Sequence, residues 1–443
     1  MPCENFLQIF MAKNFKRMKR IFVILLAGLL LSSCAKKYMS LNERLASLEA
    51  ERIDTIKADT SVFKQAFEIH LLQPLDHNDP DGEKFSQRIY LSYAGADKPI
   101  VLVTEGYGAG RNYTTELADY LDCNQIIAEH RYFGESVPDS LDWEYLNTFQ
   151  AASDHHRIIE LFSEMFSGKW ITTGISKGGQ TVMYHSFYYP GDADIRIPYV
   201  APLNFGPEDP RIYTFLDTVA SENCRERVLA VQNHILENRD VYYPMMLEMA
   251  DSAGMTFNRI GGPEKAFEYA VLEYDFAYWQ WGNTSCDDII IDSEPDSVFD
   301  QFFSISDIGY FSDQGIKGLE PFFYQALTEI GYYGYRFDVF GDQLQYVTDS
   351  EMPDFTFSAP EGVELVYDYE LMKQVDEYVR DADNFIFIYG MQDTWSATGV
   401  QLSDRSNSLK IMKKGGDHRT QIRNLPEEQR ELVLTTINDW LEE

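Results

Sequence analysis

The chain has 443 residues, of which 71 are Asp or Glu and 37 are Lys or Arg, so its formal net charge at pH 7 is −34. So acidic a surface repels phosphate backbones, which argues against nucleic acid as a partner. The length exceeds one ordinary domain. After residue 34 the cysteines Cys123, Cys224 and Cys286 are too few and scattered for a disulfide framework or a zinc site, although one bridge between Cys224 and Cys286 suits an oxidising envelope.

Residues 1–33 have the pattern of a bacterial lipoprotein signal peptide. Basic residues between 13 and 20 precede an apolar run from Ile21 to Leu31, which is too short for a membrane-spanning helix. The following Leu-Ser-Ser-Cys is typical of a lipobox, so we expect Cys34 to carry a lipid that anchors the protein in the bacterial cell envelope. An ordinary signal peptide followed by a chance cysteine is the alternative. Residues 34–60 are predicted to be a tether.

Short apolar runs alternate with helical stretches between residues 61 and 204. FEIHLL and FSQRIYLSY flank a polar turn, and PIVLVTEGYG, NQIIAEHRYFG, WITTGIS and IRIPYVAPLN read as further strands. Helices are predicted over 147–166 and 177–188. Because several strands are continuously apolar, the pattern predicts a parallel sheet covered by helices on both faces.

The stretch WITTGISKGGQ joins a β-favouring run to a helix through Gly174-Ile175-Ser176-Lys177-Gly178. This Gly-x-Ser-x-Gly spacing is typical of the nucleophile elbow of α/β-hydrolases, a strained turn that presents a serine Oγ above the sheet. A glycine-rich turn is the alternative, and the pentapeptide alone does not decide between them. A nucleophilic Ser176 also requires a histidine and a carboxylate from later in the chain.

From residue 205 to 355 the β pattern is replaced by long amphipathic helical stretches that are rich in aromatic residues. Residues 356–443 then resume the strand pattern with NFIFIYGMQD and SLKIMKKGGDH, and they close with a helix that begins near Pro426. The predicted fold class is therefore α/β, an α/β-hydrolase sheet in two parts (61–204 and 356–443) with an inserted helical cap domain (205–355).

Three histidines follow Ser176, which allows the base to be chosen by elimination. His185 lies nine residues along the helix that Ser176 opens, roughly 13 Å away at about 1.5 Å per residue. His234 falls within a cap helix. His418 follows the last predicted strand in the loop KKGGDHRT, at the position that a hydrolase base requires. His418 is therefore the predicted base.

The carboxylate that orients this base should close a strand upstream of it. Asp393 ends the strand NFIFIYGMQD, where side chains meet at the carboxyl edge of a sheet. Asp417 competes, but it is adjacent to His418, and neighbouring side chains rarely point the same way. Asp404 falls in a polar stretch. We predict Asp393 as the triad carboxylate, with a turn or helix-capping role as the alternative.

Two backbone amides are expected to form the oxyanion hole. One belongs to Lys177, which follows the serine, and the other to Tyr107 in the loop TEGYGAG. Glu105 in the same loop is awkward for an esterase but would suit an enzyme that captures a free ammonium. An ion pair between Glu105 and Arg131 or Lys177 is an equally weighted alternative.

The motifs TEGYG, EHRYFGES, TGISKGGQT, YVAPLN, GMQDTWSATG and GGDHR, in this order, resemble the PS-10-type bacterial serine aminopeptidases, serine peptidase family thirty-seven. QPLDH, FSQRIYLSY and EHRYFGES also resemble the related prolylcarboxypeptidase and dipeptidyl peptidase family. That family has Gly-Gly-Ser-Tyr-Gly-Gly at the elbow, whereas Gly174 to Gly179 here fit the first family. The resemblance spans residues 67–419 and implies the same triad, Ser176, Asp393 and His418.

Both families are exopeptidases with a helical cap, and the resemblance suggests where substrate binds. DFAYWQWGNTSC resembles a cap segment that lines their specificity pocket, although an aromatic run in a helix is equally typical of core packing. In EHRYFGES, charged side chains could bind the substrate amine or form a structural ion-pair network. The candidate substrate-binding residues are Glu105, Glu129, Arg131, Glu135, Trp279, Gln280 and Trp281.

The predicted function is a serine exopeptidase that removes short peptides from free N-termini through an acyl-enzyme. Peptides are the expected substrates, and neither a metal nor an organic cofactor is implied. A carboxyl-terminal peptidase or an esterase on the same scaffold is the second possibility. A non-catalytic lipoprotein that binds peptide or glycan is the third, suggested by the 14% aromatic content.

Overall fold

The computed structural model describes residues 40–282, 285–347 and 355–443. Cys34 and the predicted signal peptide lie outside these residues. The chain divides into two units, Met1–Glu49 and Ala50–Glu443. In the first unit, helix α2 (Leu41–Leu45) begins at a capping box between Ser40 and Glu43. In the described parts of the chain, no helix combines the length and apolar character needed to cross a bilayer.

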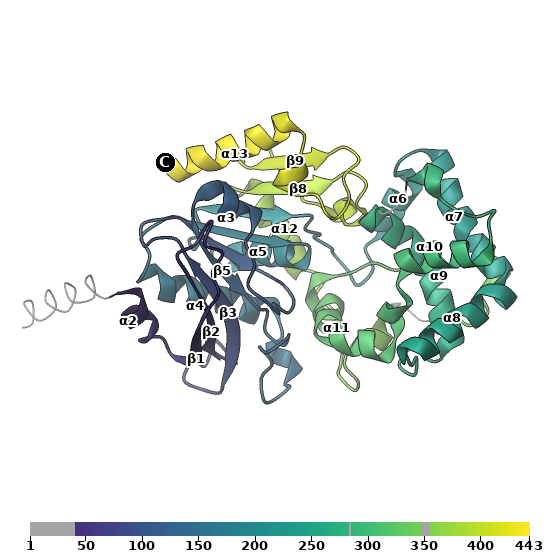
Figure 1. The fold of residues 1–443 in the computed structure, drawn as a ribbon, viewed down its shortest axis with the longest axis horizontal. Helices are drawn as coiled ribbons and strands as arrows, with labels where there is room; N and C mark the ends of the chain where they lie inside the picture. Colours follow the sequence, from purple (N-terminus) through teal and green to yellow (C-terminus); the bar gives the residue numbers. More distant parts are fainter. Residues whose placement is uncertain (1–39, 283–284, 348–354) are drawn as a thin grey trace, which may run out of the picture. The chain divides into compact units, whose positions relative to one another are not determined.

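A nine-stranded mixed sheet forms the centre of the second unit (Figure 1). Its spatial order is β1-β2-β3-β5-β4-β6-β7-β8-β9. Strands β4 to β9 pair in parallel, whereas β1, β2 and β3 pair antiparallel with their neighbours. The strands are β1 (Ala50–Ile56), β2 (Gln65–Pro74), β3 (Lys84–Tyr93), β4 (Ile100–Thr104), β5 (Asn124–Ala128), β6 (Trp170–Ile175), β7 (Ile195–Tyr199), β8 (Ile386–Gly390) and β9 (Leu409–Lys413).

Two expectations about the sheet need correction. The predicted tether 34–60 contains strand β1, which extends the sheet by pairing antiparallel with β2 over six residue pairs. The sheet is also mixed rather than parallel, because the polar turn after Pro74 folds β3 back along β2. A direct turn of this kind can only join antiparallel strands.

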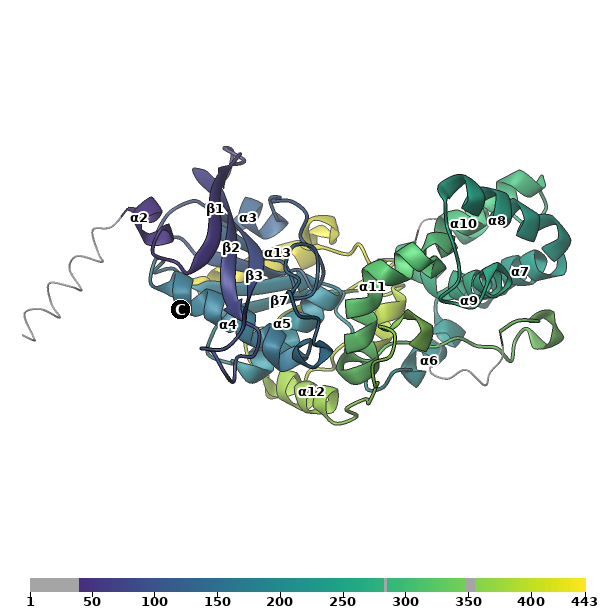
Figure 2. The same ribbon diagram turned by 90° about the horizontal axis from the view of Figure 1, so that it is seen from below.

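Helices cover both faces of the sheet, as the apolar strands predicted. Alternate side chains of β8 show the two faces, because Phe387 belongs to one buried cluster and Ile386 and Ile388 to the other. The first cluster includes α4 (Thr148–Ser163), α5 (Lys177–Tyr188) and α12 (Leu371–Asp381); the second includes α3 (Glu116–Leu121) and α13 (Glu427–Glu442). The sheet therefore lies between two helical layers (Figure 2).

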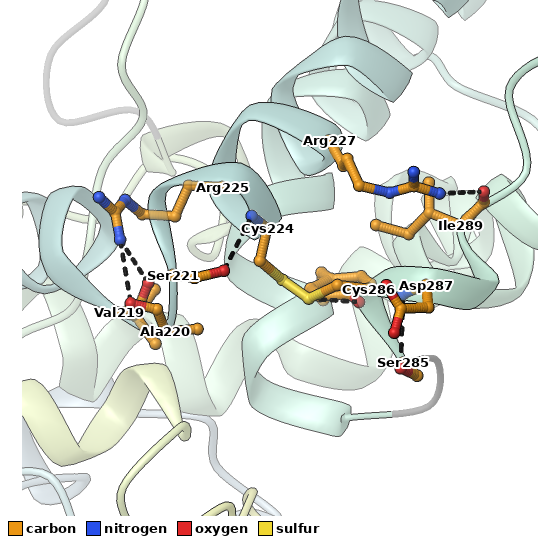
Figure 3. Close-up of a disulfide and its surroundings, with 11 residues drawn as sticks. Val219, Ala220, Ser221, Cys224, Arg225, Arg227, Ser285, Cys286, Asp287 and Ile289 are labelled. Carbon is orange, nitrogen blue, oxygen red and sulfur yellow. Dashed lines mark hydrogen bonds between the residues drawn. A yellow bond between two sulfur atoms is a disulfide. The ribbon is translucent and has the colours of Figure 1, made fainter.

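Between β7 and β8 the described residues form helices and loops only. Before α12, which covers the sheet, the α-helices of this stretch are α6 (Pro210–Thr218), α7 (Glu222–Glu237), α8 (Arg239–Ala253), α9 (Pro263–Trp281), α10 (Pro295–Ser306) and α11 (Asp313–Gln325). Helix α9 is buried along most of its length, and α7, α8 and α10 pack around it (Figures 1 and 2). Cys224 of α7 and Cys286 form a disulfide that ties this group together (Figure 3).

Candidate active site

Ser176 lies at the turn between β6 and α5 in a conformation that is rare for a residue with a side chain. Its φ is 55° and its ψ is −120°. Turns of this kind hold strain, and in hydrolases they present the nucleophile away from the backbone. Because Gly178 has no β-carbon, the turn packs closely against the end of β4. A β-carbon at this position would collide with the carbonyl oxygen of Thr104. Ser176 itself is half-buried.

Asp393 and His418 come together beyond the ends of β8 and β9. Nδ1 of His418 lies 2.8 Å from Oδ2 of Asp393, and the Asp393 side chain is fully buried. Because a carboxylate only accepts hydrogen bonds, Nδ1 carries the proton and Nε2 remains available as a base. Burial raises the pKa of Asp393, and the neighbouring His418 opposes that shift. Ser176 follows β6, so all three residues lie at the carboxyl ends of parallel strands.

The competing histidines have partners elsewhere. Nε2 of His185 lies 2.9 Å from Oδ2 of Asp192, and Nε2 of His234 lies 2.9 Å from the hydroxyl of Tyr242. The competing carboxylate Asp417 is also engaged, since it pairs with Arg419 at 2.6 Å. The geometry therefore leaves Asp393 and His418 as the carboxylate and imidazole that contact each other at this edge of the sheet.

The end of cap helix α9 contacts the loop that carries His418. The amide of His418 donates to the carbonyl oxygen of Gln280 at 2.9 Å, and the Trp281 ring packs edge-on against the imidazole with centroids 5.7 Å apart. Trp281 is 40% exposed, whereas Trp279 is buried in the core. Trp281 is thus available to substrate, whereas the predicted substrate-binding role of Trp279 does not fit its burial.

The predicted oxyanion amides belong to two segments that touch. Gly106 has a φ of +77°, and a β-carbon there would lie 2.6 Å from the amide nitrogen of Gly178. This places the 106–107 peptide against the first turn of α5. Within the described residues, the amides of Tyr107 and Lys177 have no hydrogen-bond acceptor. Two unpartnered donors beside a serine are what an oxyanion hole needs.

Glu105 lines a pocket of about 140 Å³ that also includes Ile175, the residue before Ser176. The Tyr113 hydroxyl donates to its Oε1 at 2.6 Å. Burial raises the pKa of Glu105, with the Tyr113 hydrogen bond acting in the opposite direction. The ion pairs of Glu105 with Arg131 or Lys177 that the sequence allowed are not formed. Arg423 lines the same pocket, but its guanidinium pairs with Glu116 at 3.1 Å. Within the described chain, Glu105 therefore has no ion-pair partner.

Glu129 is wrong as a substrate-binding residue, because it is fully buried and its acceptors are occupied. Its two oxygens accept from the Ser136 hydroxyl, the amides of Ala109 and Glu135, and the guanidinium of Arg88. This set of donors neutralises and solvates the carboxylate inside the protein. Its role is to hold the loops after β4 and β5.

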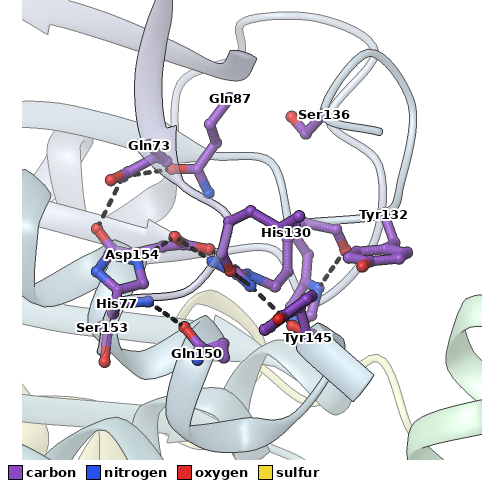
Figure 4. Close-up of polar contacts among 12 residues, drawn as sticks. Gln73, His77, Gln87, His130, Tyr132, Ser136, Tyr145, Gln150, Ser153 and Asp154 are labelled. Atoms are coloured by element: carbon purple, nitrogen blue, oxygen red, sulfur yellow. Dashed lines mark hydrogen bonds and ion pairs between the residues drawn. The ribbon is translucent and has the colours of Figure 1, made fainter. Parts of the chain in front are cut away.

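Arg131 is also structural. Its guanidinium forms a two-pronged ion pair with Asp154, with distances of 2.7 and 2.8 Å, and is fully buried. It also donates to the carbonyl oxygen of Tyr145 at 2.7 Å. His77 lies 2.7 Å from the same Asp154 (Figure 4). The ion-pair alternative is therefore correct here.

Glu135 keeps a half-exposed side chain, but Arg88 binds it at 2.7 Å. It lies in a cluster with Glu68 and His70 that could hold a metal ion by distance alone. However, Nη2 of Arg52 contacts both His70 and Glu68, at 2.7 and 3.0 Å, and already supplies the positive charge. Glu135 is thus a weaker candidate for amine binding than Glu105.

Comparison with known proteins identifies the family. The profile described as PS-10 peptidase S37 matches residues 35–442, almost the whole chain. The chain belongs to the PS-10 peptidase family. It is therefore a serine peptidase, and the predicted α/β-hydrolase fold is confirmed by this membership together with the mixed nine-stranded sheet.

Individual relatives agree with this family. The PS-10 peptidase described here is 29% identical over 376 residues to the prolyl tri/tetrapeptidyl aminopeptidase of Streptomyces mobaraensis, covering 83% of this chain and 78% of that protein. It is 30% identical over 146 residues to a protein of Arabidopsis thaliana named Probable serine protease EDA2, covering 28% and 30% of the two chains.

Among solved structures, proline iminopeptidase of Mycobacterium smegmatis matches with a TM-score of 0.37 and 13% identity, covering 84% of this chain and 98% of that one. At that score the two backbones differ too much for the likeness to bear on activity.

Two features of this PS-10 peptidase site were not found from the sequence. Tyr113 holds Glu105, but nothing local marks it, because the contact depends on how the loop after β4 folds back. The side chain of Lys177 is buried beside Gly106, although only its backbone amide was predicted to act. The sequence signal for such a role is the presence of a lysine directly after the serine of the elbow.

Proposed function

We propose that this PS-10 peptidase is an aminopeptidase that releases short peptides from free N-termini through an acyl-enzyme. Ser176 Oγ attacks the scissile carbonyl carbon while His418 Nε2 takes its proton, and Asp393 holds the imidazole. The amides of Lys177 and Tyr107 stabilise the oxyanion. The C–N bond then breaks as His418 passes the proton to the leaving amine, and water hydrolyses the Ser176 ester by the same route. The 2.8 Å contact between His418 and Asp393 supports this assignment of roles.

The observation that carries the amino-end specificity is the carboxylate of Glu105, which lines a pocket that also includes Ile175, the residue before Ser176, and which forms no ion pair within the described chain. An exopeptidase must distinguish a chain end from a peptide bond, and the α-ammonium is the group that marks the amino end. A charge-assisted hydrogen bond from this ammonium to Glu105 would be stronger than a neutral one. The Streptomyces relative is named an aminopeptidase, which supports cleavage from the amino end, and the word prolyl in its name suggests a preference for proline.

The pocket also constrains the length of the product. An extended peptide gains roughly 3.3 Å per residue, so the distance from Glu105 to Ser176 sets how many residues are released. Trp281, which lies over His418 and is partly exposed, would contact the residues next to the scissile bond. Mass spectrometry of products from a peptide library with free and blocked ends would determine both the length and the proline preference.

The proposed function is tested by comparing free and N-acetylated versions of one peptide with wild-type enzyme and with Glu105→Gln. We expect acetylation to reduce kcat/KM by at least a hundredfold in the wild type, and Glu105→Gln to lower activity on free peptides far more than on a small activated ester. Glu135→Gln is the matched control and should change kcat/KM only slightly, because Arg88 already occupies that carboxylate. Equal cleavage of blocked and free peptides would refute aminopeptidase activity and favour a carboxyl-terminal peptidase.

The pH dependence should follow the same pair of charges. Activity on free peptides should fall at acid pH as Glu105 takes up a proton. Because burial raises the pKa of Glu105, this fall should begin at a higher pH than it would for an ordinary glutamate. It should also fall as pH rises through the ammonium pKa of about 7.7–8.0. Both falls are measured in the dependence of kcat/KM on pH. The fall at alkaline pH, which is due to the ammonium, should be absent with the activated ester.

We also propose that Cys34 is lipidated and holds the enzyme at the cell envelope. The supporting observation is the basic patch and apolar run that end in Leu-Ser-Ser-Cys. Cys34→Ala should abolish incorporation of labelled palmitate and make the protein recoverable without detergent. Cys3→Ala is the control and should leave incorporation unchanged. Normal labelling of the Cys34 variant would disprove the anchor.

A further inference from the structure

The side chain of Lys177 is buried directly behind the predicted oxyanion hole. Only 2% of the residue is exposed, and its Nζ donates to the carbonyl oxygen of Gly106 at 2.6 Å. The ring centroids of Tyr107 and Phe133 lie 5.5 and 5.4 Å from the same nitrogen. In the described part of the chain, no carboxylate pairs with it. One backbone carbonyl and two aromatic faces therefore surround this amine.

Such a group is costly to bury. An ammonium inside a protein is ordinarily paired with a carboxylate, because the loss of water is otherwise not compensated. Burial lowers the pKa of Lys177 well below its usual value, which reflects that cost. An apolar side chain would fill the same space without it. The one specific polar contact that the lysine adds is the hydrogen bond to Gly106, so its role is sought there.

The geometry of a peptide unit links this hydrogen bond to the oxyanion hole. In a trans peptide the C=O and the N–H of the same unit point in opposite directions. Because the Gly106 carbonyl points to Lys177 Nζ, the N–H of Tyr107 points away from it, and that N–H has no acceptor within the described residues. The next carbonyl, that of Tyr107, accepts from the amide of His130 at 3.0 Å. Both carbonyls that flank the Tyr107 backbone are thus held.

We propose that Lys177 is a positioning residue, whose Nζ holds the Gly106 carbonyl so that the Tyr107 N–H is aimed at the developing oxyanion. This inference rests on the proposed roles of Ser176 and the two amides. The hydrogen bond also polarises the peptide unit, which makes its N–H a stronger donor. A donor fixed in advance stabilises the transition state more than the ground state, so its loss lowers kcat rather than raising KM.

The experiment compares Lys177→Met with the wild type in three measurements. These are kcat and KM on a free peptide, the affinity for a peptide boronate that forms a tetrahedral adduct with the serine, and binding of uncleaved peptide in a Ser176→Ala background. We expect kcat to fall at least tenfold and boronate affinity to fall by a similar factor. KM and peptide binding should change less than threefold. Active-site titration with a fluorophosphonate corrects each rate for the fraction of folded enzyme.

Lys410→Met is the matched control. Lys410 Nζ also lies over an aromatic ring, that of Tyr389 at 5.4 Å, but on β9 away from the elbow. This variant should keep wild-type kcat and boronate affinity. If Lys177→Met does not fold, Lys177→Gln takes its place. The glutamine keeps a hydrogen-bond donor, so we expect smaller falls in kcat and in boronate affinity. Failure of both variants to fold would assign the lysine to packing and overturn the proposal.

Two outcomes separate this inference from the proposed function. Lack of fluorophosphonate labelling in the wild type would reject Ser176 as the nucleophile and with it the function. Normal labelling and normal boronate affinity in Lys177→Met, with any change confined to KM or thermal stability, would reject only the positioning role.

Discussion

At the scale of single residues, Asp393 has both oxygens occupied. Oδ2 accepts from His418, and Oδ1 accepts from the amide of Trp395 at 3.2 Å, which makes Asp393 the N-cap of the short helix Thr394–Thr398. The turn or capping role considered as the alternative is thus compatible with the proposed catalytic role. The contact with the Trp395 amide holds the carboxylate from within its own loop, whereas His418 comes from the loop after β9.

This arrangement predicts that Asp393→Asn lowers kcat by about 10⁴-fold while the fold is retained, because an amide favours the wrong imidazole tautomer; losses of this size are known for other serine peptidases. The amide oxygen can still accept from Trp395, so the capping contact persists. Asp417→Asn is the control, since Asp417 pairs with Arg419 instead, and it should stay within a few-fold of wild type. Steady-state kinetics with circular dichroism check both. A reversed ranking of the two variants would show that the wrong carboxylate was assigned.

At the scale of elements, the helices α7, α8 and α10 are held together by packing on α9 and by the disulfide between α7 and the segment after α9. The Cα atoms of Cys224 and Cys286 lie 5.4 Å apart, and 62 positions separate them in sequence. The bridge closes a loop that contains α8 and the whole of α9. It therefore limits the unfolded states of the element that carries Trp281.

Removing this bridge should destabilise the protein by about 4 kcal/mol on loop-closure entropy alone. We expect the double variant Cys224→Ser/Cys286→Ser to have a lower Tm and to be cleaved faster by trypsin between residues 222 and 306. A reducing agent should lower the Tm of the wild type and leave that of the double variant unchanged. Cys123 is buried and unpaired, so Cys123→Ser should retain the response to reductant. An equal Tm for wild type and double variant would contradict the prediction.

At the scale of the whole molecule, stability should depend on pH through carboxyls buried in α9. Both Tyr333 and Tyr335 donate to Glu273 at 2.7 Å, and burial raises its pKa to about 8. The folded state therefore binds a proton that the unfolded state releases near pH 4.3. The contribution is complete below that pH and is lost as pH rises to about 8.

Glu273→Gln removes this titration but keeps an oxygen that accepts from the tyrosines. The variant should gain stability relative to the wild type as pH rises from 5 to 8, by up to a few kcal/mol. Glu268→Gln, on the same helix, is the matched contrast. Glu268 pairs with Arg239 and accepts from three backbone amides, so its loss should destabilise at neutral pH. Thermal melts across pH test both, and a constant difference between Glu273→Gln and wild type would refute the pH effect.

Features set by spacing along the chain were readable from the residues alone. The two glycines around Ser176, the apolar runs of the parallel strands, the helix over 177–188 and the order of serine, aspartate and histidine all depend on short segments or on a fixed strand order. Strand β1 was missed because its alternation is weak and its stability comes from pairing with β2. Edge strands of this kind carry little local signal.

The roles of the charged residues required the tertiary structure. Glu105, Glu129 and Glu135 are the same residue type, and the sequence favoured Glu105 for amine binding but kept Glu129 and Glu135 as alternates. They differ in the structure because Arg88 of β3 binds Glu129, 41 positions later, and Glu135, 47 positions later, but does not bind Glu105. A buried carboxylate is defined by the donors and cations that surround it, and those arrive from distant segments. The local pattern placed the chemistry at the edge of the sheet, whereas long-range packing decided which charges remain free to meet a substrate.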